Sequence, residues 1–291
     1  MTEPKCKLND GHLMPMVGLG TYGLSDQMST NVAVDAALAN GYRLFDSAKF
    51  YQNEHELGNA FEKFLPKHQL KRSDIFIETK VNISGRHVPT VIANMINNSL
   101  SAFKTEYLDL ILIHYPKDWG RSDDDPQNRQ NRSDAYRVLE EFQDAGKVRS
   151  IGVSNFEARH INQLLEDGHR LPAVNQCEFH PHLARPELRD YCIQKSIQFQ
   201  AHTSLAKQSR SLYKEPILKQ IAGTHNLTIP QTLLGFAYWQ GIAVIPKSGN
   251  PDRIASNLKF LKEPLSSEEI KLLNELDEFK HYSDCEGWKV L

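Results

Sequence analysis

Three apolar runs in the first half of the chain each end in one ionisable residue. The run Tyr42–Asp46 ends in an acid, Ile75–Lys80 ends in a lysine, and Leu108–His114 ends in a histidine. A tyrosine, Tyr51, follows the first run by five residues. These four side chains are what a carbonyl-reducing site needs: a proton donor, a cation to lower its pKa, an anion to hold the cation, and a polar group to orient the substrate.

The three runs belong to a longer series of strand-like and helix-like segments. The predicted strands are Val17–Gly20, Tyr42–Asp46, Ile75–Lys80, Leu108–His114, Arg149–Val153, Ala173–Gln176, Gln198–His202 and Ile242–Pro246. The segments with helical periodicity are Thr30–Ala39, Glu54–Phe64, Thr90–Phe103, Arg132–Ala145, Glu157–Glu166, Pro186–Lys195 and Glu215–Ala222. Eight strands alternating with helices predict one domain, residues 1–291, with the α/β fold of a closed (β/α)8 TIM barrel.

Additional segments are expected at both ends and in one insert. A short β-hairpin around Asp10-Gly11 precedes the barrel, and a helix over Ser266–Lys280 with a tail ending near Trp288 follows it. The polar insert Lys117–Asn131 is predicted to be a solvated loop after the fourth strand.

A barrel places its active site at the carboxyl ends of its strands. Besides the ionisable residues above, further strands end in Ser154-Asn155, Gln176, His202-Thr203 and Lys247-Ser248. Polar side chains at the same end of seven strands indicate one assembled site.

Composition excludes several classes of protein. The formal net charge of -2 gives no reason to expect nucleic acid or an anionic membrane as a partner. No apolar run approaches the length of a membrane span, and the first residues do not form a signal peptide pattern. The four cysteines lie far apart without a Cys-x-x-Cys motif, as expected of reduced cysteines in the cytosol.

A doubly wound dehydrogenase is the main alternative fold. The segment Gly18-Leu-Gly20-Thr-Tyr-Gly23 matches the dinucleotide fingerprint, and the next strand ends in an acid, Asp46. Two features favour the barrel: Tyr51 follows that acid on the loop, and polar strand ends continue along the whole chain.

The chain resembles the aldo-keto reductase superfamily. The matching segments follow the order of the family over nearly the whole chain: Gly18–Tyr22, Gly41–Gly58, Glu78–Lys80, Leu112–Pro116, Gly146–Phe156, Val174–Pro181 and Ile245–Ser248. The resemblance implies an NADPH-dependent reductase of aldehydes and ketones, with the cofactor extended across the strand ends.

The resemblance implies a catalytic tetrad of Asp46, Tyr51, Lys80 and His114. Tyr51 is expected to donate the proton, Lys80 to favour ionisation of Tyr51, and Asp46 to hold Lys80 charged. His114 is expected to be neutral and to orient the substrate carbonyl.

The same resemblance assigns residues to the cofactor. Gly20 and Thr21 are expected to contact the cofactor. Ser154, Asn155, Gln176 and His202 are expected near the nicotinamide, Thr203 and Leu205 near the pyrophosphate, and Lys247, Ser248, Asn250, Arg253 and Asn257 near the adenosine end. Lys247 and Arg253 favour a 2′-phosphate and therefore NADPH.

The chain departs from the family pattern at His202, where an aromatic residue, commonly Tyr, stacks on the nicotinamide. An imidazole stacks over a smaller area and adds a group that titrates near pH 6.5. The segment Ala201–Ala206 also lacks the usual Pro and Gly. The pair His180 and His182 has no evident third ligand, so no metal site is predicted.

Aromatic side chains are expected to wall the substrate pocket: Tyr22, Tyr115 and Trp119, with Trp288 as a lid. Such walls favour apolar or aromatic carbonyl compounds. The resemblance favours a monomer. A catalytically weak, NADPH-binding regulatory or structural relative is the alternative function, and the intact tetrad argues against it.

Overall fold

The computed structural model describes residues 4–291 and contains an eight-stranded parallel barrel. The first residues, used above against a signal peptide, lie outside this part. The barrel strands run in chain order as β3 (Gly18–Gly20), β4 (Leu44–Asp46), β5 (Phe76–Val81), β6 (Leu108–Ile113), β7 (Val148–Ser154), β8 (Val174–Glu178), β9 (Gln198–His202) and β10 (Ala243–Val244). The predicted (β/α)8 fold is confirmed.

Single bridges between the first and last strands close the barrel. Val17 pairs with Val244 and Gly20 pairs with Lys247, both in parallel orientation. Gly20 is required for this closure, because a Cβ at that position would lie 2.5 Å from the carbonyl oxygen of Ile245. The glycine spacing that matched a dinucleotide fingerprint therefore serves strand packing in a barrel, and the doubly wound alternative is wrong.

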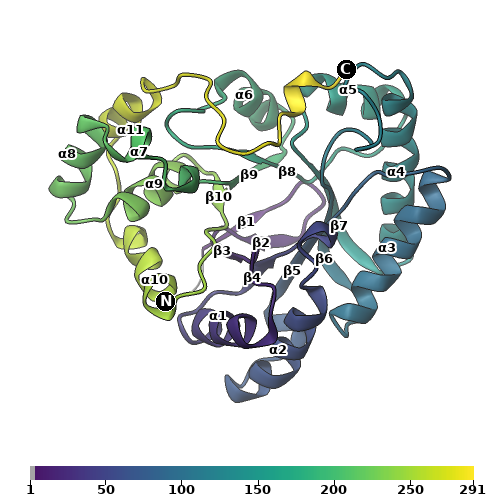
Figure 1. Ribbon diagram of the computed structural model, residues 1–291, viewed down its shortest axis with the longest axis horizontal. Coiled ribbons are helices and arrows are strands. Elements are labelled where there is room, and N and C mark those ends of the chain that lie inside the picture. The colour runs from purple at the N-terminus through teal and green to yellow at the C-terminus, as the bar shows by residue number, and fades with distance from the viewer. Residues whose placement is uncertain (1–3) are drawn as a thin grey trace.

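Helices surround the strands in a ring (Figure 1). They are α1 (Gln27–Ala39), α2 (Glu54–Lys67), α3 (Val88–Ala102), α4 (Gln127–Asp144), α5 (Ala158–Glu166), α6 (Pro186–Gln194), α7 (Arg210–Tyr213), α8 (Pro216–Thr224), α9 (Ile229–Tyr238), α10 (Pro251–Ser256) and α11 (Ser267–Asn274). The main apolar core fills the space between this ring and the outward faces of the strands, with Phe45, Ile77 and Ile111 among its residues.

Strand side chains alternate between this outer core and the barrel interior, as the period of a strand requires. One end of the interior is apolar and contains Leu44, Phe76 and Leu110. The hairpin of β1 (Lys5–Lys7) and β2 (Leu13–Pro15) adds Met14 to this cluster. The expected N-terminal hairpin is therefore present. The opposite half of the interior is polar.

Three segments differ from the sequence prediction. The insert Lys117–Asn131 is only partly a loop, because α4 begins at Gln127, whose backbone N–H donates to the Asp125 side chain at 2.9 Å. The C-terminal helix ends at Asn274 rather than Lys280. Helix α9 was not predicted, because it is buried on most of its surface and so lacks a polar face.

Among residues 4–291, no helix is both long and apolar enough to cross a membrane.

Candidate active site

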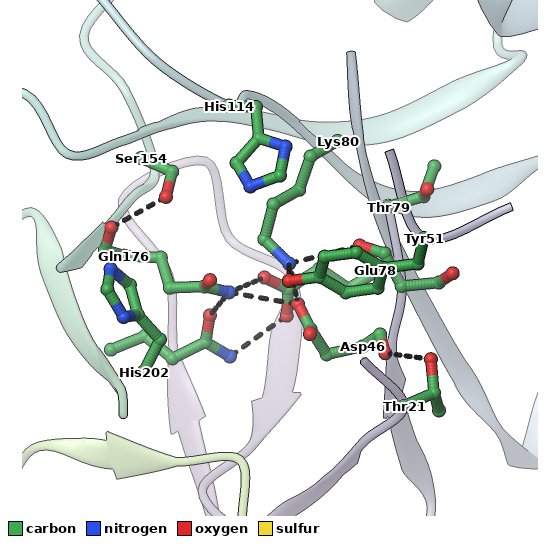
Figure 2. A network of polar contacts seen from close by, with 12 residues as sticks. Thr21, Asp46, Tyr51, Glu78, Thr79, Lys80, His114, Ser154, Gln176 and His202 are labelled. Carbon is green, nitrogen blue, oxygen red and sulfur yellow. Dashed lines mark hydrogen bonds and ion pairs between the residues drawn. The ribbon is translucent and has the colours of Figure 1, made fainter. Parts of the chain in front are cut away.

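The carboxyl ends of the strands bring Asp46, Lys80, His114 and Tyr51 together (Figure 2). Lys80 is fully buried, and its ammonium group forms an ion pair with the carboxylate of Asp46. The same nitrogen lies 3.0 Å from the carbonyl oxygen of Ser47 and 3.3 Å from the hydroxyl oxygen of Tyr51. The cation is thus fixed between an anion and a phenol.

Tyr51 lies on the short 3-10 helix η1 (Lys49–Tyr51), which follows β4. Asn53 anchors this loop from a fully buried position. Its side-chain oxygen accepts from the hydroxyl of Ser47 at 2.7 Å, and its amide donates to the carbonyl oxygen of Thr21 at 2.9 Å. The Thr21 hydroxyl in turn donates to the carbonyl oxygen of Asp46 at 2.8 Å. Thr21, predicted to contact the cofactor, uses its side chain to hold this loop.

Protonation states follow from burial and charge. Burial raises the pKa of Tyr51 to about 12, although the charge of Lys80 opposes the rise. Burial alone would lower the pKa of Lys80, but Asp46, Tyr51 and Glu78 raise it above its ordinary value. The expected effect of Lys80 on Tyr51 is present but smaller than the effect of burial. At neutral pH the site therefore holds a protonated phenol beside an ammonium group.

His114 follows β6 and faces Tyr51 edge-on, with ring centroids 5.9 Å apart. Burial and the charge of Lys80 hold the pKa of His114 well below its usual value, so the ring is neutral. Its buried Nδ1 atom has no hydrogen-bonding partner among the described residues. The ring is thus held at the site in its neutral form.

Glu78, a carboxyl group that the sequence analysis did not assign, lies beside the tetrad in the barrel interior. It is fully buried, and its two oxygens accept from the amides of Gln176 at 2.7 Å and Gln200 at 2.9 Å. The alternation of β5 could have revealed it, because Glu78 and Lys80 are two residues apart and must share a face.

The side chains predicted near the nicotinamide are joined to one another. Ser154 donates to the carbonyl oxygen of Gln176 at 2.8 Å, and Asn155 donates to the carbonyl oxygen of His114 at 2.9 Å. The side-chain amide of Gln176 points into the interior, 3.0 Å from Asp46 (Figure 2). The structure thus shows these groups positioned by protein contacts.

His202 lies at the end of β9, as predicted, with its Nε2 atom 2.7 Å from the side-chain oxygen of Asn155. Burial lowers the pKa of His202 to about 4, and the charge of Lys80 adds to the shift. This shift moves the titration of the imidazole away from the pH of about 6.5 expected from the sequence. A partly buried imidazole close to a cation stays neutral throughout the physiological range.

The residues predicted near the phosphates occupy one edge of the strand ends. Lys247 and Arg253 are exposed, and neither has a side-chain ion pair among residues 4–291. Ser248 and Asn257 are buried, and the Asn250 side chain accepts from the backbone N–H of Arg253 at 3.0 Å. Ser248, Asn250 and Asn257 are thus part of the turn and helix that carry Lys247 and Arg253.

The loop predicted to cover the pyrophosphate, residues 203–208, has an unusual backbone. Thr203, Ala206, Lys207 and Gln208 have positive φ angles of 53°, 48°, 48° and 57°. Residues other than glycine rarely adopt this backbone conformation. The loop is therefore strained, because it lacks the Gly that is usual in the family pattern. Leu205 within it packs partly against the main core.

Aromatic rings lie next to Tyr51 and His114. Tyr22 lies edge-on to Tyr51 with centroids 5.1 Å apart, and Tyr115 stacks on Trp119 at 5.2 Å. Phe50, which the sequence analysis missed, stacks on Trp119 at 6.5 Å and is 60% exposed. Exposed Tyr22, Phe50 and Trp119 thus form an aromatic rim.

The C-terminal segment is fastened beside this rim by buried Glu178. The Glu178 carboxylate accepts from the backbone N–H of Tyr282 at 2.8 Å and from the hydroxyl of Ser283 at 2.7 Å. His180 and His281 also contact it, at 3.0 and 3.1 Å. His180 of the His-Pro-His turn thus helps to bind the tail.

The end of the segment packs on Asn155 and α5. A Cβ at Gly287 would lie 1.8 Å from the carbonyl oxygen of Asn155, so only glycine permits this approach. Arg159 and His160 hold the carbonyl oxygen of Val290 at 3.0 and 2.8 Å. In Figure 1 the segment, in yellow, passes from α11 to α5. Trp288 stacks on His281 with centroids 3.7 Å apart, and its role as a lid stays a prediction.

Comparison with known proteins assigns the fold and site to one family. A family model described as "Aldo/keto reductase family" matches residues 16–278. The chain belongs to the aldo/keto reductase family. It is 34% identical to Aldose reductase B of Dictyostelium discoideum, covering 95% of this chain and 94% of the relative.

Two further relatives of similar length agree with this membership. The chain is 34% identical to the NADPH-dependent D-xylose reductase of Meyerozyma guilliermondii, over 97% of this chain and 96% of the relative. The crystal structure of an aldo-keto reductase enzyme from a Medee basin deep-sea metagenome library superposes with a TM-score of 0.85 at 33% identity, covering 97% of this chain and 99% of that one. Membership of the aldo/keto reductase family supports oxidoreductase activity through carbonyl reduction with a nicotinamide cofactor.

Proposed function

We propose that the protein reduces aldehydes and ketones to alcohols with NADPH, and that Tyr51 is the proton donor. The observation that supports this most is the Tyr51 hydroxyl, protonated at neutral pH and 3.3 Å from the buried ammonium of Lys80. A phenol is a useful acid at neutral pH only where a nearby cation stabilises the phenolate that forms as it donates.

The four residues have separate roles in the proposed reaction. The bound cofactor supplies a hydride to the carbonyl carbon, and negative charge develops on the carbonyl oxygen. Tyr51 donates its proton to that oxygen, and Lys80, kept charged by Asp46, stabilises the tyrosinate. The neutral ring of His114 donates a hydrogen bond that orients the carbonyl. Its neutral state fits this role, because a neutral imidazole keeps one N–H donor.

NADPH is proposed over NADH because Lys247 and Arg253 are exposed cations with no acidic partner among the described residues. Lys247 also reaches towards the opposite loop, because its Nζ atom would lie 3.8 Å from a Cβ at Gly23. Two unpaired cations at one edge of the strand ends suit a dianionic 2′-phosphate.

Small carbonyl compounds with apolar or aromatic groups are the proposed substrates, since the rim of Tyr22, Phe50 and Trp119 offers aromatic surface. We further propose that the protein acts as a monomer in the cytosol. A non-catalytic NADPH-binding relative would not need a buried Lys80–Asp46 pair aimed at Tyr51, and this ion pair favours the enzyme.

The test is NADPH oxidation against a panel of aldehydes, ketones and sugars, with Tyr51→Phe as the key variant. Tyr51→Phe should lower kcat by about 100-fold or more and leave the Kd for NADPH nearly unchanged, because the hydroxyl acts in the transition state. A variant that keeps more than about a tenth of the wild-type kcat would show that Tyr51 is not the acid.

A further inference from the structure

Glu78 and Asp46 are a pair of carboxyl groups directly opposite each other inside the barrel. They are register partners on the parallel strands β5 and β4, and both are buried. Two carboxylates buried at one site repel each other, so one of them tends to keep a proton. Lys80 forms its ion pair with Asp46, which leaves Glu78 as the group that retains the proton.

The hydrogen bonds of Gln176 also indicate an additional proton. The side-chain nitrogen of Gln176 lies 3.0 Å from Asp46, 2.7 Å from Glu78 and 2.7 Å from the side-chain oxygen of Gln200. An amide nitrogen carries two hydrogens, so it cannot donate to three oxygens at these distances. The cluster thus has more acceptor oxygens than hydrogens, and a proton on Glu78 lowers this excess by converting one carboxylate oxygen into a hydroxyl group.

The charges around Glu78 also favour its protonated form. Lys80 is the cation of this interior layer, and its charge is matched by Asp46. Gln176 and Gln200 are neutral. Burial and the charge of Asp46 raise the pKa of Glu78 to about 8, although Lys80 opposes the rise. The other titratable groups around the layer are Tyr51, His114 and His202, which are uncharged at neutral pH.

We propose, on the basis of the function proposed above, that Glu78 is a positioning residue that holds a proton at neutral pH, and that its ionisation in alkaline solution weakens proton donation by Tyr51. An ionised Glu78 places a second negative charge beside the Asp46–Lys80 pair. That charge opposes formation of the tyrosinate, so the rate of reduction falls as Glu78 loses its proton. The neutral form keeps the positive charge of Lys80 available to Tyr51.

The first experiment measures kcat from pH 6 to 10 with saturating NADPH and 4-nitrobenzaldehyde. For the wild type we expect kcat to fall roughly three- to tenfold from pH 7 to 9, around one ionisation near pH 8. In Glu78→Gln the fall in kcat should be absent. In Glu78→Asp, which keeps a carboxyl group, the fall should be present as in the wild type. The control Glu54→Gln removes a buried carboxylate that is paired with Lys49. In this variant the ratio of kcat at pH 7 to kcat at pH 9 should equal that of the wild type.

The second experiment does not require activity. Infrared difference spectra between pH 6 and 10 should contain a protonated-carboxyl band that is lost on titration in the wild type and absent in Glu78→Gln. Superimposable pH profiles of wild type and Glu78→Gln, or a band that persists in that variant, would overturn the proposal. If no carbonyl compound is reduced but the band behaves as expected, the proposed function fails and the protonation of Glu78 stands.

Discussion

The side-chain amide of Asn53 donates to the carbonyl oxygen of Thr21 at 2.9 Å, and this bond connects the loop of Tyr51 to the end of β3. Both residues are fully buried. The position of Tyr51 relative to Lys80 therefore depends on a hydrogen-bonded loop, whereas Lys80 itself is fixed within a strand.

Asn53→Ala should loosen this loop and leave the Ser47 hydroxyl and the Thr21 carbonyl without their partner. We expect a loss of about 1–3 kcal/mol in the free energy of unfolding and a fall in kcat larger than the change in the Kd for NADPH. Urea unfolding and steady-state kinetics measure the two effects. The control is Asn9→Ala, which removes a similar bond to the carbonyl oxygen of Pro172. If both variants retain the same kcat, Asn53 does not position Tyr51.

Lys247→Ala and Arg253→Ala should weaken NADPH binding more than NADH binding. A charge-assisted contact to phosphate contributes about 1.5–3 kcal/mol, or roughly 10- to 100-fold in affinity. Fluorescence titration with each cofactor measures both dissociation constants. Lys262→Ala removes another exposed lysine and serves as the control. Equal losses for NADPH and NADH would mean that neither residue contacts the 2′-phosphate.

His202→Tyr should make the protein less sensitive to acid. The folded-state pKa of His202 is about 4, below its ordinary value of 6.5, so the unfolded chain binds more protons between these values. The free energy of unfolding therefore falls as the pH drops through this window. We expect the loss between pH 7 and 5 to be about 1–2 kcal/mol smaller in the variant.

Denaturant unfolding at pH 7, 6 and 5 measures this difference. His55→Tyr, at an exposed histidine, is the control and should leave the pH dependence unchanged. If the free energy of unfolding depends on pH in the same way in the wild type and in His202→Tyr, the folded protein does not hold His202 in its neutral form.

Glu178→Gln should release the C-terminal segment. The substitution replaces one acceptor oxygen with a donor that faces the N–H groups of Tyr282 and Ser283. Loss of hydrogen bonds to a buried charge should lower the free energy of unfolding by about 1.5–3 kcal/mol. It should also increase cleavage by proteases within residues 281–291.

Limited proteolysis followed by mass spectrometry measures this release. The control Glu286→Gln breaks a more exposed ion pair with Lys289 in the same segment and should have little effect. Equal cleavage in both variants would contradict the role of Glu178 as the anchor.

Most strand ends could be predicted because an apolar run in the sequence stops there at a polar residue, as at Asp46 and Lys80. The barrel follows from that pattern. Glu78 escaped notice because it lies within such a run, where one polar residue does not interrupt the strand. Its partners Gln176 and Gln200 come from β8 and β9, about 100 residues further along the chain, and only the closed barrel brings them together.

The pKa of His202 could not be predicted for a related reason. An isolated histidine in the sequence has its ordinary pKa, and the shift to about 4 depends on burial and on Lys80, which lies on another strand. The strain of residues 203–208 likewise becomes visible only from backbone angles, although the lack of Gly in that loop indicated that it would differ.

The anchoring of residues 281–291 has a consequence for the order of events during synthesis. These residues follow every barrel strand in the chain, yet they satisfy Glu178 and cover Asn155. A ribosome therefore finishes all eight strands before the residues that pack on Asn155 and Glu178 have been made. Until then the Glu178 carboxylate lacks the N–H and hydroxyl groups that donate to it in the folded protein, so this anchor can form only after the barrel strands have been synthesised.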